Sequence, residues 1–138
     1  MQRTFSIIKP DATKRDITGS INKIIEDNGL RITAQKRIQL SVSQAKEFYK
    51  IHSEKFFFND LIEYMTSGPV IVQVLEGTDA VSCYRNIMGS TNPEQAEEGT
   101  IRKIYALNVQ ENSVHGSDCL ENAIKEIDFF FNNSEIIG

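Results

Sequence analysis

The 138-residue sequence predicts an α+β domain in which an antiparallel sheet carries helices on one face. The apolar residues change between a two-residue and a helical period, in the order βα, β, a helical insertion, βα, β and a last helix. Neither repeats nor low-complexity tracts interrupt this order. Without the insertion and the last helix it reduces to βαββαβ, a ferredoxin-like arrangement within one domain spanning residues 1–138.

The first elements are marked by composition and by the residues that end them. Residues 4–8 are rich in β-forming side chains, and Pro10 stops the run because it fixes φ and lacks an N–H. Residues 19–28 place isoleucines at helical spacing and end at Asn28-Gly29, a typical helix C-terminus. Residues 30–40 alternate apolar and polar side chains, which predicts a strand with one buried face.

The second half repeats these signals. Two apolar segments within residues 41–67 have the helical period and predict a helical hairpin. Residues 70–75 are a β-branched run of strand length, and residues 79–88 return to helical spacing. Residues 89–99 contain few apolar side chains, which predicts a long surface loop before a strand at residues 101–109.

Composition limits the class of protein. A hydrophobic content of 40% and a charged content of 25% are typical of a packed globular domain. The net charge of −4 argues against general nucleic-acid binding, although it allows a local positive pocket. Cys83 and Cys119 lack the spacing of a zinc site or a disulfide framework. With neither a signal peptide nor a membrane-length apolar stretch, we expect a cytoplasmic protein without membrane association.

His115 lies in the most informative motif of the chain, Asn-Ser-Val-His-Gly-Ser-Asp. Gly116 permits close approach of backbone to the histidine, and Ser117 or Asp118 can cap a helix predicted after the motif. A histidine beside a helix N-terminus is suited to a site that holds an anion such as phosphate. The residues alone leave two interpretations open, a nucleophile or base at such a site and a surface histidine.

Other polar residues extend the hypothesis. Glu126 lies on the predicted last helix where its carboxylate could orient the imidazole, although an exposed helix residue is the simpler interpretation. Lys9, Arg85 and Arg102 are cations that could surround the histidine, and each alone is typical of a surface charge. A phosphoryl group in transfer needs several fixed positive charges around its oxygens.

Taken together, these motifs resemble the nucleoside diphosphate kinase family. Asn112-x-x-His115-Gly116-Ser117-Asp118 is similar to its active-site signature, and Ile8-Lys9-Pro10-Asp11 is similar to its N-terminal motif. Further matches follow in the right order and spacing: Tyr49, Phe57-Phe58, Leu61, Arg85, Thr91-Asn92-Pro93 and Gly99-Thr100-Ile101-Arg102. The resemblance extends from Thr4 to Phe131, nearly the whole chain.

The resemblance implies a role for each matching residue. His115 would accept the phosphoryl group, with Glu126 and Ser117 in support. The phosphates and sugar would be bound by Lys9, Tyr49, Arg85, Thr91, Arg102 and Asn112. Phe57 would lie against the base with Leu61 nearby, and Asp118 would reach Mg²⁺ through water. The implied reaction is ping-pong transfer of the γ-phosphoryl group from a nucleoside triphosphate to a nucleoside diphosphate, by a homo-oligomer that is a tetramer or a hexamer.

The sequence departs from the family pattern at three places. Lys103-Ile104-Tyr105 stands where Gly-Asp and an aromatic residue are common, Lys55-Phe56 replaces the common Arg-Pro, and the chain ends soon after Phe131. These departures concern subunit contacts more than the reaction. Two alternatives are a nucleotide-binding regulator without turnover and a hydrolase using Ser117 with His115, which lacks the GxSxG context.

Overall fold

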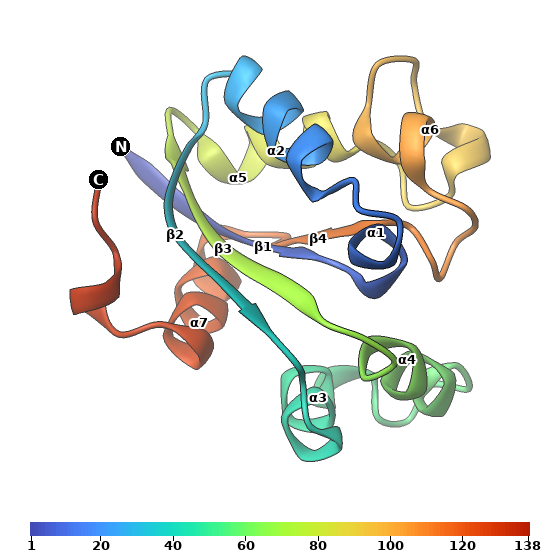
Figure 1. Cartoon of the computed structure of the whole chain (residues 1–138). Coiled ribbons are helices and arrows are strands. Elements are labelled where there is room, and N and C mark those ends of the chain that lie inside the picture. The colour runs from blue at the N-terminus through green and yellow to red at the C-terminus, as the bar shows by residue number, and fades with distance from the viewer.

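The computed structural model describes all 138 residues and confirms an α+β domain on a four-stranded antiparallel sheet (Figure 1). The strands are β1 (Gln2–Ile8), β2 (Arg31–Ile38), β3 (Val70–Gly77) and β4 (Val114–Gly116), in the spatial order β2-β3-β1-β4. β1 therefore pairs on both edges, with β3 along its whole length and with β4 at its end. Within the second pair, Ile7 lies opposite His115.

Seven α-helices surround the sheet. They are α1 (Pro10–Lys14), α2 (Thr18–Asp27), α3 (Val42–Phe48), α4 (Phe58–Met65), α5 (Ala80–Met88), α6 (Ile101–Tyr105) and α7 (Leu120–Phe130). One-turn 3₁₀ helices lie at Lys50–His52, Pro93–Gln95 and Asn133–Glu135. The predicted hairpin is present as α3 and α4, and Ser41 begins α3 with a capping box to Gln44. No helix of the chain is both long and apolar enough to cross a membrane.

The two helices of the predicted βαββαβ core lie on one face of the sheet, as expected, and the inserted hairpin and the last helix cover the other face, which the sequence did not assign to them. On one face α2 and α5 pack over Ile8 and Leu75, and on the other α3, α4 and α7 pack over Phe5 and Val72 (Figure 1). The predicted βαββαβ core accounts only for α2 and α5. The inserted hairpin and the last helix cover the second face, because β1 and β3 carry apolar side chains on both of their faces.

The strand predicted at residues 101–109 is wrong, because this segment begins with helix α6. Thr100 caps the helix by accepting a hydrogen bond from the Lys103 amide at 3.3 Å. The edge of the sheet is instead formed by β4, which contains the histidine motif itself. A three-residue strand is too short to show an alternating pattern, so nothing in the sequence distinguished it from a loop.

Gly116 is required by a close approach of α5 to β4. A Cβ added at this position would lie 2.7 Å from Met88 Cε and 2.8 Å from Tyr84 Cδ2. The Tyr84 ring is fully buried, and its hydroxyl is hydrogen-bonded to the Ser6 hydroxyl at 2.8 Å, so the ring cannot move aside. The pairing of β4 beneath α5 therefore depends on the absence of a side chain here.

We expect Gly116→Ala to lower the free energy of unfolding by about 1–3 kcal/mol through overpacking. Urea denaturation of both proteins measures the difference. Gly19→Ala is the matched control, because a Cβ there has no neighbour within 4 Å and the residue lies in α2, where alanine is favoured. A Gly116→Ala protein with the stability of the wild type would contradict this packing argument.

Candidate active site

A pocket of about 590 Å³ opens where the ends of β1 and β4 meet the α3–α4 hairpin and the segment after α5. It brings together residues from distant parts of the chain. Its walls include His115 and every residue for which the sequence implied nucleotide binding, namely Lys9, Tyr49, Phe57, Leu61, Arg85, Thr91, Arg102 and Asn112. Ser117 and Glu126 lie behind His115, and Asp118 does not line the pocket.

His115 is held by a carboxylate from α7. Its Nε2 lies 2.9 Å from Glu126 Oε1, and the Ser117 hydroxyl donates to the same oxygen at 2.7 Å. A carboxylate only accepts, so Nε2 carries the proton of this bond, and in the neutral ring Nδ1 is the nitrogen with the free lone pair. Because Ser117 binds the carboxylate and not the imidazole, the two side chains do not form the nucleophile–base pair that a hydrolase would need.

Aromatic side chains fix the plane of the imidazole. The rings of Phe5, Phe48 and Tyr49 meet it edge-on, with centroids 6.2, 5.6 and 6.4 Å away. Phe5 belongs to the central strand, whereas Phe48 and Tyr49 come from the end of α3. These contacts and the bond to Glu126 hold the half-buried ring in one orientation at the pocket wall.

Two buried cations lie in the same wall. Lys9 follows β1 directly, and its Nζ donates to Asn112 Oδ1 at 2.9 Å. Burial and, second to it, the charge of Arg102 lower the pKa of Lys9 to about 7, and the charge of Asp11 acts in the opposite direction. Arg102 donates to the carbonyls of Gly89 at 3.0 Å and Val114 at 2.9 Å, so one guanidinium joins α6, the end of α5 and β4. Burial also lowers the pKa of Arg102.

Three pocket residues carry buried polar atoms without a partner. These atoms are Tyr49 Oη, His52 Nδ1 and Arg102 Nε, half of the six such atoms in the protein. Burial, followed by the nearby charge of Glu126, raises the pKa of Tyr49, so its hydroxyl remains a proton donor. Buried polar groups are nearly always hydrogen-bonded in folded proteins. Together with the cations Lys9, Arg85 and Arg102 in the lining, this polar wall suits a ligand with several hydrogen-bond acceptors, such as an anion.

Asp11 holds the turn that precedes β4, the strand that contains His115, and the sequence did not reveal this role. Its carboxylate accepts from the Ser113 amide at 3.2 Å, the Ser113 hydroxyl at 2.8 Å, Arg15 at 2.9 Å and the Tyr64 hydroxyl. Ser113 has a φ of 73°, an unfavourable backbone conformation for serine. Asp11 thus stabilises the turn from which Val114 and His115 extend. The only sequence signal for Asp11 was its place in the Lys9-Pro10-Asp11 motif. The sequence also did not indicate that His52 lines the pocket.

Asp118 lies outside the pocket wall. Its carboxylate accepts from Asn122 Nδ2 at 2.6 Å, and this bond is the main cause that lowers the pKa of Asp118. The prediction that Ser117 or Asp118 caps α7 is wrong, because Cys119 occupies the N-cap and its sulfur accepts from the Asn122 amide. No cluster of three or more His, Cys, Asp or Glu side chains is placed to hold a metal ion.

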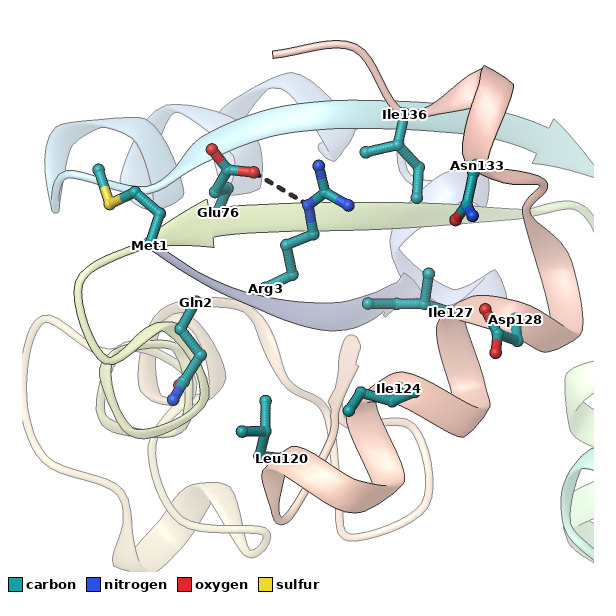
Figure 2. A pocket seen from close by; sticks show the side chains of 10 residues that line it. All are labelled: Met1, Gln2, Arg3, Glu76, Leu120, Ile124, Ile127, Asp128, Asn133 and Ile136. Atoms are coloured by element: carbon teal, nitrogen blue, oxygen red, sulfur yellow. Dashed lines mark hydrogen bonds and ion pairs between the residues drawn. The ribbon is translucent and has the colours of Figure 1, made fainter.

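A second groove, of about 570 Å³, lies at the opposite end of β1 (Figure 2). Arg3 Nε donates to Glu76 at 3.0 Å across its floor, and Leu120 and Ile124 of α7 form one side. The groove and the histidine pocket share no residue. Of these two pockets, only the histidine pocket is lined by residues with unpartnered buried polar atoms and by the predicted site residues, and it is therefore the candidate site.

Comparison with known proteins gives consistent matches. A family model described as nucleoside diphosphate kinase matches residues 2–136. The chain is 64% identical over 137 residues to a nucleoside diphosphate kinase of Phenylobacterium zucineum (99% of each chain), and 62% identical over 138 residues to one of Azorhizobium caulinodans (100% of this chain, 99% of the other).

Solved structures agree with these matches. The crystal structure of the Aquifex aeolicus nucleoside diphosphate kinase superposes with a TM-score of 0.96 at 39% identity, covering 99% of each chain. A halophilic nucleoside diphosphate kinase from Halobacterium salinarum, in complex with CDP, gives a TM-score of 0.95 at 37% identity, covering 99% of this chain and 91% of the other.

Lys9 leads to a prediction about stability and pH. The pKa of Lys9 is about 7 in the folded chain and 10.5 when unperturbed, so between these values the unfolded chain binds more protons and the free energy of unfolding rises with pH. Below pH 7 the buried Lys9 amine is charged in the folded chain, so burial of this charge lowers the free energy of unfolding by its full amount. We expect Lys9→Met to stabilise the fold more at pH 6 than at pH 9, by about 1–3 kcal/mol in urea denaturation.

The control for this experiment is Lys14→Met, since Lys14 is exposed on the neighbouring helix α1. Its effect on stability should be the same at both pH values. If Lys9→Met also had the same effect at pH 6 and pH 9, the buried charge at Lys9 would be disproved.

Proposed function

This chain belongs to the nucleoside diphosphate kinase family, and we propose that it transfers the γ-phosphoryl group of a nucleoside triphosphate to a nucleoside diphosphate through His115. The family acts through a phosphohistidine intermediate. The observation that carries the assignment to this residue is the bond from His115 Nε2 to Glu126, which leaves Nδ1 as the unprotonated nitrogen in a pocket lined by cations.

Both half-reactions follow from this arrangement. Nδ1 of His115 attacks the γ-phosphorus, the bond from that phosphorus to the β–γ bridging oxygen breaks, and the nucleoside diphosphate leaves. A terminal oxygen of a second diphosphate then attacks the phosphorus, the P–N bond breaks and the imidazole is regenerated. The ring gains positive charge when Nδ1 is phosphorylated, and the Glu126 carboxylate at 2.9 Å from Nε2 stabilises that charge.

Fixed positive charge offsets the charge on the phosphate oxygens. Lys9, Arg85 and Arg102 line the pocket from three separate elements, and Arg102 Nε is a buried donor without a partner in the chain. A bound phosphate favours the protonated amine, so the pKa of Lys9 rises above its value of about 7 when nucleotide binds. Thr91 and Tyr49 supply neutral hydroxyl donors for the same oxygens or for the sugar.

The remaining pocket residues bind the nucleoside. Phe57 is half-buried and offers an aromatic face, which stacks on any base because every base has a π-face. Leu61 extends this apolar surface, and Asn112 contributes an amide near the sugar. A structural relative is described in complex with CDP, which supports nucleotide binding by this chain. Stacking without base-edge hydrogen bonds suits an enzyme that accepts several nucleotides.

Kinases of this family use a divalent cation, which we propose to be Mg²⁺. The residues present fit a metal that arrives with the nucleotide, since no cluster of three protein ligands exists and Mg²⁺ commonly binds substrate phosphates and water. Asp118 does not line the pocket but would reach this cation through water: its pKa is lowered by the bond to Asn122 and also by the charge of Arg85, which does line the pocket, so its exposed carboxylate stays ionised. Bound there, the cation would neutralise charge on the β- and γ-phosphate oxygens.

We further propose a homo-oligomer, a tetramer or a hexamer. Large apolar side chains that the fold leaves exposed support association, among them Ile104, Leu107 and Leu120. Ile104 belongs to a segment where the sequence departs from the family pattern, so the choice between the two assemblies depends on this chain's own contacts. A cytoplasmic location stays a prediction from the sequence.

The proposal is tested by labelling. Incubation with γ-labelled ATP and Mg²⁺ should give a phosphoprotein that is stable in base and labile in acid, as expected for a phosphoramidate, and His115→Ala should not be labelled. The second histidine gives the matched control, because His52→Ala removes an imidazole from the same pocket and should keep the label. Labelling of His115→Ala would overturn the mechanism, and an unlabelled wild type would favour a regulator without turnover.

Glu126 is expected to act through the imidazole. Glu126→Gln removes the negative charge beside Nε2, so we expect the rate of phosphorylation to fall about 10- to 100-fold, as for other residues that support a catalytic group. Rapid-quench measurement with saturating ATP gives this rate. Glu121→Gln, on the same helix but paired only with Lys125, is the control. An unchanged rate in Glu126→Gln would show that the carboxylate has no part in the step.

A further inference from the structure

Phe56 lines the pocket, but its side chain is not packed against the rest of the protein. Its side chain lines the pocket, yet it is 98% exposed, more than any other large hydrophobic side chain of the chain. An aromatic ring with so little burial contributes almost nothing to folding. Its large apolar surface is available to a molecule in the pocket.

The neighbouring ring of Phe57 is held in place. His52 lies against it with ring centroids 5.7 Å apart, the ammonium of Lys55 lies 5.7 Å from its centroid, and its carbonyl accepts the Leu61 amide that begins α4. Phe56 has no comparable partner on its outer side. The two phenylalanine rings meet at 84° with centroids 5.5 Å apart. We call this right-angled pair the aromatic corner.

The direction of a bound nucleotide follows from the proposed function, on which this inference rests. Its phosphates lie toward His115 and the buried cations, so its base points toward the exposed mouth. Phe56 lines the same pocket and stands perpendicular to Phe57, an orientation suited to meeting the edge of a base that is stacked on Phe57. Edge-to-face contact is a favoured geometry for aromatic rings. A purine, with its second ring, reaches further from the sugar than a pyrimidine does.

We propose that Phe56 is a second base-contacting residue and that the aromatic corner makes this chain favour purine over pyrimidine nucleotides. Phe57 stacks on either kind of base, whereas Phe56 contacts only the part that a purine adds. The discrimination acts on binding, since Phe56 lies at the end of the pocket away from the reacting phosphorus. It is therefore expected in KM, with turnover at saturation little changed.

The test compares GDP and CDP as acceptors, with ATP as a saturating donor. In Phe56→Ala we expect the KM for GDP to rise about three- to tenfold and the KM for CDP to change less than twofold, consistent with loss of one edge contact. Phe56→Trp should keep the wild-type preference for GDP over CDP, because it replaces one aromatic ring by another. Ile51→Ala is the matched control, since Ile51 is 77% exposed in the same segment but does not line the pocket.

Three results would overturn the inference: equal increases for GDP and CDP, no increase for either, or an altered preference in Ile51→Ala. A change in native mass by light scattering, without a base-dependent change in KM, would assign Phe56 to a subunit contact instead. Failure of the proposed function is recognised separately, because the wild type would then lack the acid-labile label. In Phe56→Ala that label should still form.

Discussion

The position of β1 at the centre of the sheet is the constraint on which the site depends. β1 is paired with β3 along its whole length and with β4 at its end, and helices cover both faces of the sheet, so the point where β1 ends is held from all sides. Lys9 follows that end, and β4 aligns His115 beside Ile7. Lys9 and His115 are 106 positions apart in the sequence. Strand pairing brings them to the same pocket, so no flexible loop is needed to join them.

The same site carries groups that are unfavourable for folding. Lys9 and Arg102 are buried cations whose pKa values are lowered, Ser113 has a positive φ, and several polar atoms have no partner. These features concentrate around one pocket, and the two apolar clusters on either side of the sheet must compensate for them. A pocket prepared in this way needs little rearrangement when an anion enters, which favours catalysis over stability.

The sequence predicted the chemistry better than the architecture. Lys9, Arg102 and His115 are recognisable because charged or reactive residues stand in specific motifs, and the pocket contains all three. The β4 strand was missed because three residues are too few for a period, and α6 because its Thr100 cap is a local signal easily attributed to a loop. The supporting role of Asp11 could not be predicted, since its partners Tyr64 and Ser113 are distant in sequence and no pattern records their contact.

Arg102 also connects ligand binding in the pocket to the stability of the fold. Its guanidinium joins the carbonyls of Gly89 and Val114, and the residue also lines the pocket. A ligand anion that binds beside this guanidinium binds only the folded chain, so by mass action it raises the free energy of unfolding in proportion to the logarithm of its concentration. The folding equilibrium of this kinase is thereby coupled to the abundance of its own substrates, and the nucleotide supply helps to set how much of the chain is folded.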